Sequence, residues 1–483
     1  MIRNKNVTLL RVLLAAVLAL TAMPKAHAES LIVEAESFSK RGGWVVDQQF
    51  MDIMGSPYLI AHGMGVPVSD AVTTVNINSG GTYHVYVRTY NWTSPWTTKP
   101  GAGAFEVSVG GKRLRTVGQT GNRWQWQKAG TVRLKAGATQ LRLHDLTGFD
   151  GRCDAILLTT DGSMVPPDDA RSQDAFRSGI NGTSLEPRDA GKYDMVVVGA
   201  GVAGMSAAVA AARLGLRVAL IGDRPVAGGN NSSEVRVHMG GRLGVGPYPK
   251  LGQLQQEFAP RREGNAQPAA YYEDQKKMQW LQQEHGVSLF MGVHADGVIM
   301  DGARIASITA RNVLSGERLR FRAQLFADCT GDATIGYLAG ADWRMGRESR
   351  SEYGESRAPE RADSMTMGAS VQWYAAASKG RERFPLFEYG VVLNDSTAER
   401  VLKGEWTWET GMNRNQITEA ERIRDYGLIV VYSNWSYLKN RLPERRDYAN
   451  YRLDWVAYVA GKRESRRLLG DYVLKEDDLV RHM

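Results

Sequence analysis

Residues 192–204 read KYDMVVVGAGVAG, and this stretch decides the fold of the chain. Met195–Val198 is an apolar run typical of a buried parallel strand, and Gly199, Gly201 and Gly204 fill the three glycine positions of G-x-G-x-x-G. The first glycine permits a tight turn, the second lets backbone approach a pyrophosphate, and the third lets a helix pack on the strand. The stretch therefore predicts a dinucleotide-binding turn at the end of a strand.

The residues that follow the turn complete the pattern. The alanine-rich segment Met205–Leu214 predicts a helix whose N-terminus offers free N–H groups and a partial positive charge to phosphates. Leu216–Ile221 (LRVALI) predicts a second parallel strand. A lone G-x-G-x-x-G is a weak signal, because a glycine-rich turn in an ordinary sheet can carry it. Strand, helix and strand in this order favour a Rossmann-like α/β domain over that alternative.

Length and charge limit the classes of protein that remain. A chain of 483 residues, 43% hydrophobic and 23% charged, predicts two or three globular domains. Half of the net charge of +8 comes from the first 28 residues, which hold four basic residues (Arg3, Lys5, Arg11 and Lys25) and no acid. We therefore infer no nucleic-acid surface from the basic balance.

Residues 1–28 have the pattern of a signal peptide. Basic residues precede the apolar run Val12–Met23, and Ala26-His27-Ala28 resembles a cleavage site. The apolar run is too short to span a bilayer. We therefore expect no membrane span and an exported chain, periplasmic or secreted, that begins near Glu29. Cys153 and Cys329 lie in different predicted domains, so we expect no disulfide between them.

Residues 29–161 predict an all-β sandwich, and residues 162–190 a linker. Short alternating runs recur between turn signals. The predicted strands are Leu31–Glu34, Val72–Ile77, Tyr83–Tyr90, Phe105–Val109, Thr131–Leu134, Gln140–His144 and Ala155–Thr159. The segment 162–190 contains Pro166-Pro167 and Asn181-Gly182, a composition typical of a linker.

An aromatic group stands out within the sandwich. Its members are Tyr90, Trp92, Trp96, Trp124 and Trp126. Exposed indole faces would stack on sugar rings and bind a glycan. Alternatively these side chains are core, or pack against the next domain, because tryptophan is usually well buried.

The sandwich segment resembles carbohydrate-binding modules of the β-sandwich type. VEAES at 33–37, GGW at 42–44 and GRCDAILLTTD at 151–161 carry that resemblance. In such modules paired glutamates and a late aspartate often hold a structural calcium, and here these would be Glu34, Glu36 and Asp154. The alternative is that the glutamates are surface residues of an edge strand.

The later motifs resemble FAD-dependent oxidoreductases of the glutathione-reductase-like fold. VVVGAGVAGMSAAVAAARLG (196–215), RPVAGGNNSSEVRVHMGG (224–241) and ADCTGDATIGYLAGADWRMGRE (327–348) carry the resemblance, which runs from Lys192 to the end of the chain. More narrowly, the motifs resemble an exported bacterial group often found near polysaccharide-degradation enzymes. The resemblance implies bound FAD and an FAD-binding domain over residues 191–343.

This resemblance also implies cofactor-binding residues. The turn would hold the pyrophosphate, one loop would run beneath the flavin side, and a later turn would bind the ribityl or pyrophosphate region. These sets are Gly199, Ala200, Gly201, Val202, Ala203 and Gly204; Gly228, Gly229 and Asn230; and Gly331 and Asp332. Asp223 and Arg224 follow the second strand, where an acid often binds ribose, but the expected slot holds Gly222. Asp332 is also a candidate N-cap of a helix over Ala333–Ala339, and both roles can hold at once.

Candidate catalytic residues lie in SSEVRVHMGG. Glu234, Arg236 and His238 alternate and would share one face of a strand. Histidine can transfer a proton near neutral pH, and arginine can bind a carboxylate or stabilise reduced flavin. The alternative is an exposed strand face of alternating polar residues. Gly461–Arg467 predicts either an arginine cluster for substrate or domain contacts, or a solvated helix start.

Residues 344–483 predict an α+β cap inserted over the flavin, with the C-terminal part of the fold missing. The fold usually closes with a further strand and a helix beneath the flavin ring, and no such segment follows Leu479. Altogether the sequence predicts a multidomain, FAD-dependent oxidoreductase that acts on a carbohydrate or related alcohol outside the cytoplasm by hydride transfer to flavin. The alternatives are a glycan-binding protein whose flavin-type domain is a scaffold, and a redox-assisted glycan-cleaving enzyme.

Overall fold

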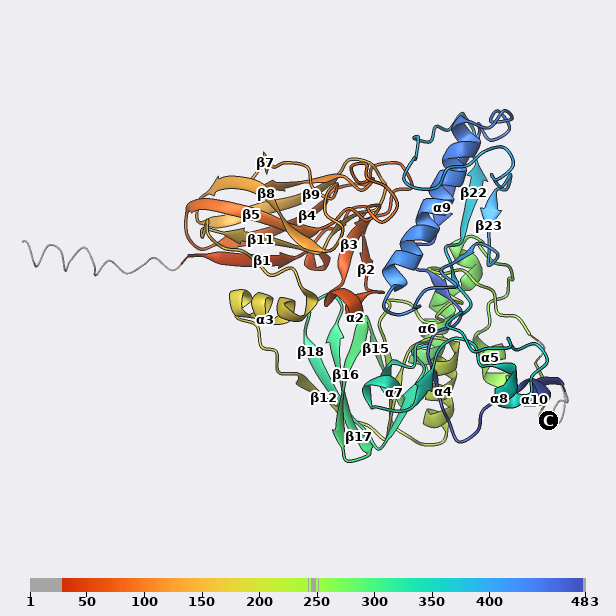
Figure 1. Ribbon diagram of the computed structural model, residues 1–483. Coiled ribbons are helices and arrows are strands. Elements are labelled where there is room, and N and C mark those ends of the chain that lie inside the picture. Colours follow the sequence, from red (N-terminus) through yellow and green to blue (C-terminus); the bar gives the residue numbers. More distant parts are fainter. Residues whose placement is uncertain (1–27, 242, 245–248, 251, 481–483) are drawn as a thin grey trace, which may run out of the picture.

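A computed structural model describes residues 28–241, 243–244, 249–250 and 252–480. Apart from Ala28, the predicted signal peptide lies outside these residues. A β-rich body formed by the first third of the chain stands beside an α/β body and a long helix, α9 (Figure 1). Within the described ranges, no helix is long and apolar enough to cross a membrane.

The β-rich body is a sandwich of two four-stranded sheets in the orders β1-β11-β5-β8 and β4-β9-β6-β7. Their bounds are β1 Ser30–Glu34, β11 Ala155–Thr159, β5 Gly81–Thr89, β8 Gln125–Leu134, β4 Ala71–Ile77, β9 Gly137–Asp145, β6 Phe105–Val109 and β7 Lys112–Arg113. All seven predicted strands are present. Alternation explains them: Phe105, Val107 and Val109 of β6 point into the core between the sheets and are fully buried.

A smaller sheet, β10-β3-β2, lies at the end of the sandwich that faces the rest of the molecule. It contains β2 Val45–Asp47, β3 Tyr58–Ala61 and β10 Gly151–Cys153, and the short helix α2 (Met51–Met54) lies between β2 and β3. The sequence did not predict these strands because β3 is buried at every position and shows no alternation. This sheet carries the sandwich residues that contact the C-terminal half.

The segment 162–190 is more ordered than a linker. Helix α3 (Ala170–Asn181) begins at Asp169, whose carboxylate accepts the N–H of Ser172 at 3.0 Å. Strand β12 (Arg188–Lys192) then pairs in parallel with β18 of the α/β body. The linker prediction is corrected here, because α3 packs on β1 and β12 joins the next sheet.

The α/β body contains the predicted parallel sheet, in the order β15-β14-β13-β19. Its strands are β15 Val287–Met291, β14 Val218–Gly222, β13 Met195–Val198 and β19 Leu325–Asp328. Helix α4 (Val202–Arg213) follows the glycine turn and packs Met205, Ala208 and Val209 against the sheet. A second sheet, β12-β18-β17-β16, lies beside it, with β16 Val293–Asp301, β17 Arg304–Asn312 and β18 Arg318–Arg322.

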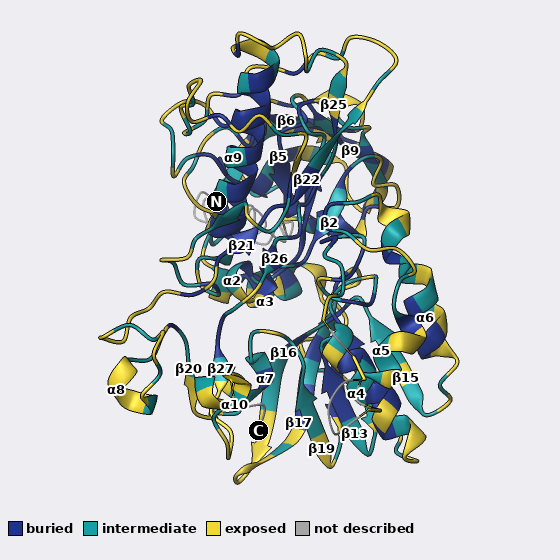
Figure 2. Ribbon diagram, turned by 90° about the vertical axis from the view of Figure 1, so that its right-hand side faces the viewer, coloured by how far each residue is buried: buried dark blue, intermediate teal, exposed yellow. Residues whose placement is uncertain are grey.

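The C-terminal part is organised around helix α9 (Ala420–Asn440), which is buried along much of its length (Figure 2). Small sheets lie beside it: β24-β21-β26, β23-β22-β25 and β20-β27. Their bounds are β20 Trp343–Arg344, β21 Ala369–Ser370, β22 Trp373–Ala377, β23 Lys403–Gly404, β24 Glu409–Thr410, β25 Tyr451–Val456, β26 Gly461–Lys462 and β27 Arg467–Leu468. The remaining helices are η1 Ala35–Ser37, α5 Gln253–Phe258, η2 Ala269–Tyr272, α6 Asp274–Gln282, α7 Thr334–Leu338, α8 Arg350–Tyr353 and α10 Glu476–Val480. That these residues form an inserted cap stays a prediction.

The sandwich and α9 share one hydrophobic core. Trp92 and Trp124 of the sandwich are buried in a cluster with Phe387, Tyr432 and Trp435 of the C-terminal part. The Trp92 indole donates to Phe149 O at 2.9 Å, and the Trp124 indole donates to Glu421 Oε2 at 3.1 Å. These two indoles therefore pack against the next domain, which was one of the alternatives, and offer no open face to a sugar.

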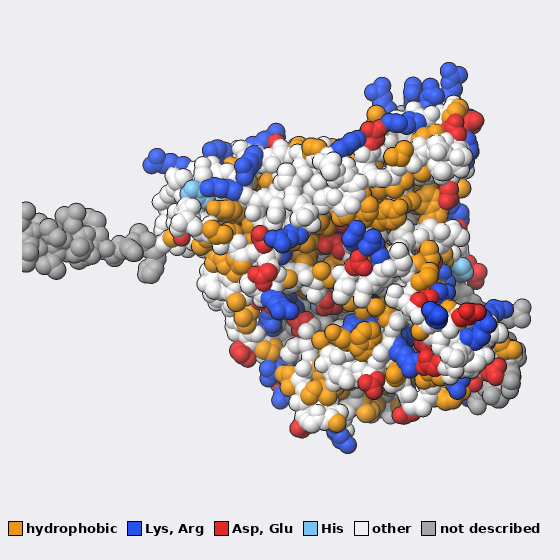
Figure 3. Space-filling model, in the orientation of Figure 1, with side chains coloured by type: hydrophobic (Ala, Val, Ile, Leu, Met, Phe, Trp, Pro, Cys, Tyr) orange, Lys and Arg blue, Asp and Glu red, His pale blue; other side chains and the backbone are white. Residues whose placement is uncertain are grey.

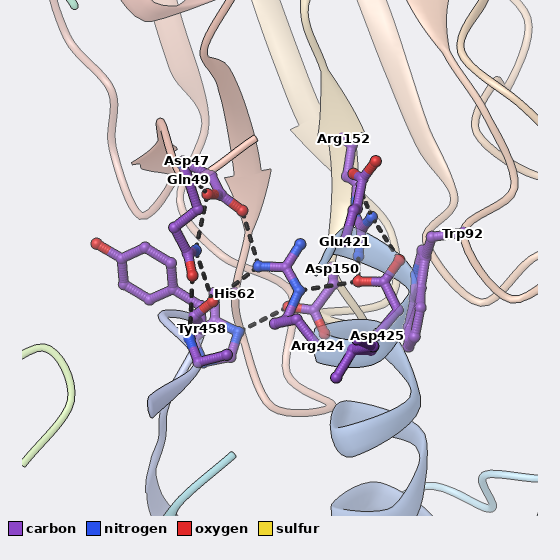
Figure 4. A network of polar contacts seen from close by, with 12 residues as sticks. Asp47, Gln49, His62, Trp92, Asp150, Arg152, Glu421, Arg424, Asp425 and Tyr458 are labelled. Atoms are coloured by element: carbon purple, nitrogen blue, oxygen red, sulfur yellow. Dashed lines mark hydrogen bonds and ion pairs between the residues drawn. The ribbon is translucent and has the colours of Figure 1, made fainter. Parts of the chain in front are cut away.

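A buried network of charges crosses the same interface (Figure 4). Arg152 on β10 forms a two-pronged contact with Asp425 on α9, at 2.6 and 2.9 Å, and a further bond with Glu421 at 3.0 Å. Arg424 on α9 reaches back to Asp47 on β2 at 2.7 Å. Burying these charges costs free energy that their pairing must offset, so the network specifies one arrangement of the two parts.

The outer surface is of mixed charge. Acidic and basic side chains alternate over the face drawn in Figure 3, with a local gathering of basic groups beyond the end of α9. The basic residues there include Arg381, Arg383, Lys439, Arg445 and Arg446.

Replacing one member of the network tests its contribution. Arg152→Met should lower the free energy of unfolding by about 3–5 kcal/mol, because Asp425 and Glu421 would stay buried without their cation. Arg113→Met is the matched control, since Arg113 is an exposed partner of Glu106 and should cost less than about 1 kcal/mol. Urea unfolding measures both. Equal losses of unfolding free energy in the two variants would show that the buried network stabilises the chain no more than an exposed ion pair does.

Candidate functional site

A cavity of about 390 Å³ lies where the carboxyl ends of β13, β14 and β19 meet. This is the edge at which open α/β sheets bind ligands. The predicted cofactor residues on its wall are Gly199, Ala200, Gly201, Asp223, Arg224, Gly229, Asn230, Gly331 and Asp332. Val202, Ala203 and Gly204 form the first turn of α4 directly behind it, and Gly228 lies in the adjoining loop. The structure thus brings the three sequence motifs to one cavity.

Glycine is required at the three positions of the motif for different physical reasons. A Cβ on Gly199 would lie 2.1 Å from Cys329 O, and one on Gly204 would lie 1.8 Å from Gly199 O. Both glycines are therefore required by the close packing of strand, turn and helix. A Cβ on Gly201 would meet only Gly229 Cα, at 3.8 Å, and the Gly201 backbone is extended with φ −73°. The fold itself tolerates a side chain at 201, so the bare backbone there fits a ligand.

The loop Gly228–Asn230 lies against the glycine turn. Gly228 N donates to Ala200 O at 2.8 Å, and the backbone of Gly201 pairs with that of Gly228. The Asn230 amide donates to Lys462 O at 2.9 Å. Beneath Gly228 lies Lys277, whose ammonium is fully buried, and burial lowers its pKa. Sequence analysis missed Lys277, because nothing in the motif pattern points to a residue 49 positions later on α6.

Asp332 faces the cavity and binds side chains from the end of the chain. Its carboxylate pairs with Lys462 Nζ at 2.7 and 2.9 Å and accepts the hydroxyl of Ser465 at 2.6 Å. The N–H groups of Asp332 and Thr334 are accepted by Thr330 Oγ1, not by the Asp332 carboxylate. The N-cap prediction for Asp332 is therefore wrong. Lys462, with Arg463 and Glu464, lines the cavity from β26 and the residues after it, where a helix start was the other reading.

Arg224, which lines the cavity, forms an ion pair with Glu234, which is not itself a lining residue. Arg224 Nη1 lies 3.3 Å from Glu234 Oε2, and among the described residues this nitrogen has no hydrogen-bond partner. Burial raises the pKa of Glu234 to about 7, although the Arg224 guanidinium acts in the opposite direction. The ion pair therefore joins a cation of the cavity wall to a buried carboxyl group that changes charge near neutral pH.

Glu234, Arg236 and His238 do not share a strand face, and that prediction is corrected. Arg236 has a left-handed backbone, with φ 64°, which turns the chain out of a strand. Its guanidinium stacks on Trp455 at 3.9 Å and donates to Ser233 O and Gln267 O. His238 Nδ1 donates to Asn265 Oδ1 at 2.9 Å. The three side chains thus point to three different neighbours, and only Glu234 pairs with a residue of the cavity wall.

A second cavity adjoins the first at Asp223 and Asp332, and we call the first the outer part and the second the inner part of the site. The inner part, of about 150 Å³, shares Asp223, Arg224, Asn230, Asp332 and Lys462 with the outer part. Its further lining residues are Gln49 and Phe50 of the sandwich, Val235 of the loop after Asn230, and several residues of the C-terminal part. The last group contains Ala369, Gln416, Ala420, Ile423, Val459 and Ala460. The site thus contains both a polar outer end and a more apolar inner end.

Two of the three carboxylates predicted to hold calcium, those of Glu34 and Asp154, pair with arginines. Arg177 of α3 pairs with Glu34 and Asp154 at 2.5 Å each, and Arg88 pairs with Asp154 at 2.6 Å. Burial, together with the neighbouring Glu34 and Asp154 carboxylates, raises the pKa of the third carboxyl, on Glu36, well above its ordinary value. Among the described residues, no group of three or more His, Cys, Asp or Glu side chains is arranged to hold a metal ion. Guanidinium groups thus neutralise Glu34 and Asp154, and calcium binding at these residues stays a prediction.

Comparison with known proteins identifies the family. Residues 194–483 match the family described as FAD dependent oxidoreductase, and this match covers more than half of the chain. The chain therefore belongs to this family and is an FAD-dependent oxidoreductase. A search of curated proteins gives no match.

Cys153 and Cys329 form no disulfide with each other in this structure.

Solved structures with lower similarity match parts of the chain. A family 35 carbohydrate binding module from Clostridium thermocellum is 20% identical over 27% of this chain and 97% of its own, with a TM-score of 0.22. THI4 from Thermovibrio ammonificans is 20% identical over 35% of this chain and 76% of its own, with a TM-score of 0.25. The myxobacterial chondrochloren halogenase CndH is 16% identical over 40% of this chain and 45% of its own, also with a TM-score of 0.25.

Two glycine substitutions separate binding from folding. Gly201→Ala should abolish FAD binding with little change in melting temperature, because its Cβ has room in the fold but occupies the expected pyrophosphate position. Gly204→Ala should lower the melting temperature by several degrees, because its Cβ meets Gly199 O. Flavin fluorescence and thermal unfolding measure the two effects. Unchanged FAD binding by Gly201→Ala would contradict the assigned site.

The pairing of Arg177 and Arg88 with Glu34 and Asp154 allows a test of whether calcium stabilises the chain. A chelator should leave the melting temperature of the chain unchanged, since guanidinium groups neutralise Glu34 and Asp154. Arg177→Met should destabilise the chain by about 3–5 kcal/mol, because it leaves a buried carboxylate short of a partner. The exposed Arg171 on the same helix, changed to Met, is the control. A melting temperature that falls with chelator would support the metal hypothesis.

Proposed function

We propose that the chain binds FAD in the cavity between the glycine turn and β26, and oxidises a carbohydrate or related alcohol outside the cytoplasm by hydride transfer to the flavin. The observation that carries the binding site is the convergence of three separate motifs, around Gly201, Gly229 and Asp332, on one cavity. The family supplies the cofactor and the reaction class. The substrate class rests on the resemblance of residues 29–161 to carbohydrate-binding modules, and the location rests on the predicted signal peptide.

The residues present fit a dinucleotide. The bare backbone at Gly201 and the N-terminus of α4 suit a pyrophosphate, and the guanidinium of Arg224 adds positive charge to the cavity wall. Asp223 lies at the end of the second strand, where a ribose hydroxyl would be bound. Lys462 neutralises Asp332, so the cavity wall at that end carries no unpaired carboxylate.

Glu234 is the proposed proton acceptor. Oxidation of an alcohol removes a hydride from carbon and a proton from oxygen; bound FAD supplies the hydride acceptor, and the chain must take the proton. With a pKa of about 7, Glu234 is ionised enough at neutral pH to accept it, and the Arg224 guanidinium stabilises the ionised form. His238 and Arg236 remain candidates from sequence, although their side chains are engaged by Asn265 and Trp455.

Anaerobic reduction of the flavin tests this function. Addition of sugars or polyols to the FAD-loaded chain should bleach the flavin absorbance, and a panel of aldoses, glycosides and polyols would identify the substrate class. The reduction rate should rise with pH through about 7, because the base must be ionised. Glu234→Gln should slow reduction by roughly 100-fold or more and remove this pH dependence. The surface variant Glu317→Gln should behave like the natural chain.

The raised pKa also predicts an effect that needs no substrate. Since the folded chain holds the Glu234 proton more tightly than the unfolded chain does, the free energy of unfolding should fall as pH rises from about 4.5 through 7. In Glu234→Gln this part of the pH dependence should vanish. A flavin that no sugar or polyol reduces would contradict the substrate class, and a rate unaffected by Glu234→Gln would contradict the proposed base.

A further inference from the structure

The inner end of the cavity has a wall that comes from the sandwich. Gln49 and Phe50, which follow strand β2, line it together with Val459 and Ala460 from the far end of the chain. Phe50 is buried, and the Arg424 guanidinium lies over its ring at 4.8 Å. The segment that carries these two residues is therefore fixed by the interface network and cannot swing away from the cavity.

Gln49 holds the opposite wall by its side-chain amide (Figure 4). Its Nε2 donates to Tyr458 O at 2.9 Å, and its Oε1 accepts the N–H of Ala460 at 3.0 Å. Asp47 Oδ1 accepts a second bond from Nε2 at 2.8 Å, which fixes the orientation of the amide. The side chain of Gln49 thus forms hydrogen bonds with the backbone of two residues more than 400 positions away. These bonds resemble those that a neighbouring strand would form.

The segment held by Gln49 leads directly to the cavity. Two residues after Ala460, Lys462 pairs with Asp332 through Nζ and accepts the Asn230 amide through its carbonyl. Lys462 is therefore held on two sides, by the pairing of β26 with β21 and by the preceding backbone that Gln49 binds. Because Asp332 and Asn230 belong to the motifs assigned to FAD, the effect of Gln49 reaches the cofactor site through Lys462.

We propose that Gln49 is a positioning residue for the flavin half of the FAD site. The sandwich thereby forms part of the wall of the cofactor cavity. This inference rests on the proposed FAD site. The ADP half of the cofactor belongs to the outer part, beside Gly201 and Asp223, while the flavin half needs the inner part that Gln49 shapes. Gln49 itself is not a catalytic residue.

The experiment compares two ligands on the full chain. Gln49→Ala should weaken the binding of FAD by roughly tenfold, because it removes two hydrogen bonds that hold the inner wall, and should leave the binding of ADP unchanged. Gln49→Glu keeps an acceptor for Ala460 N–H but loses the donor to Tyr458 O, so its FAD affinity should fall by an intermediate factor. Gln140→Ala, on the exposed surface of β9, is the control. The visible circular dichroism of bound flavin gives a second readout, which should change in both Gln49 variants.

The outcomes separate the possible errors. Equal weakening of FAD and ADP, or loss of melting temperature without a ligand difference, would assign Gln49 a purely structural role and overturn the proposal. Unchanged FAD affinity and an unchanged flavin spectrum would overturn it as well. Failure of sugars to reduce the flavin bears on the proposed substrate alone, since these binding measurements use no substrate.

Discussion

The arrangement of the whole chain depends on a charged contact between two distant segments: Arg152 of the sandwich with Asp425 of α9, and Arg424 of α9 with Asp47 of the sandwich. Each ion would be costly to bury alone, and each is offset by a partner from the other body. Aromatic packing around Trp92 excludes water and so strengthens the pairing. Because the network fixes α9 against β2 and β10, it also fixes the segments beside them, which reach the cofactor cavity.

The N-terminal sandwich takes part in the assembly of the chain. Arg177 and Arg88 pair with carboxylates along its side, and two of its tryptophans are buried against the C-terminal part. These surfaces of the sandwich are therefore contacts within the chain. The proposed carbohydrate substrate therefore has to be recognised near the flavin cavity, and a role of the sandwich in holding a polymer would need side chains other than Trp92 and Trp124.

The sequence was most informative where the cause of structure is local. The strand Met195–Val198, the glycine turn and the alternating strands of the sandwich follow from patterns within a few residues. Contacts between distant segments could not be predicted. The pairing of Arg177 with Glu34 joins residues 143 positions apart, and Gln49 meets Tyr458 across 409 positions. The prediction for Arg236 was wrong because alternation predicts a strand, whereas the residue has a positive φ and its guanidinium stacks on Trp455.

The unequal surroundings of the three motif glycines have a consequence for the comparison of related sequences. Neighbouring backbone atoms leave no room for a Cβ at Gly199 or Gly204, whereas a Cβ at Gly201 would conflict only with a ligand in the cavity. A descendant that abandoned its cofactor but kept its shape would be free to change the middle position first. Replacement there, with both flanking glycines retained, would mark a pseudoenzyme from sequence alone, whereas loss of all three would mark decay of the domain itself.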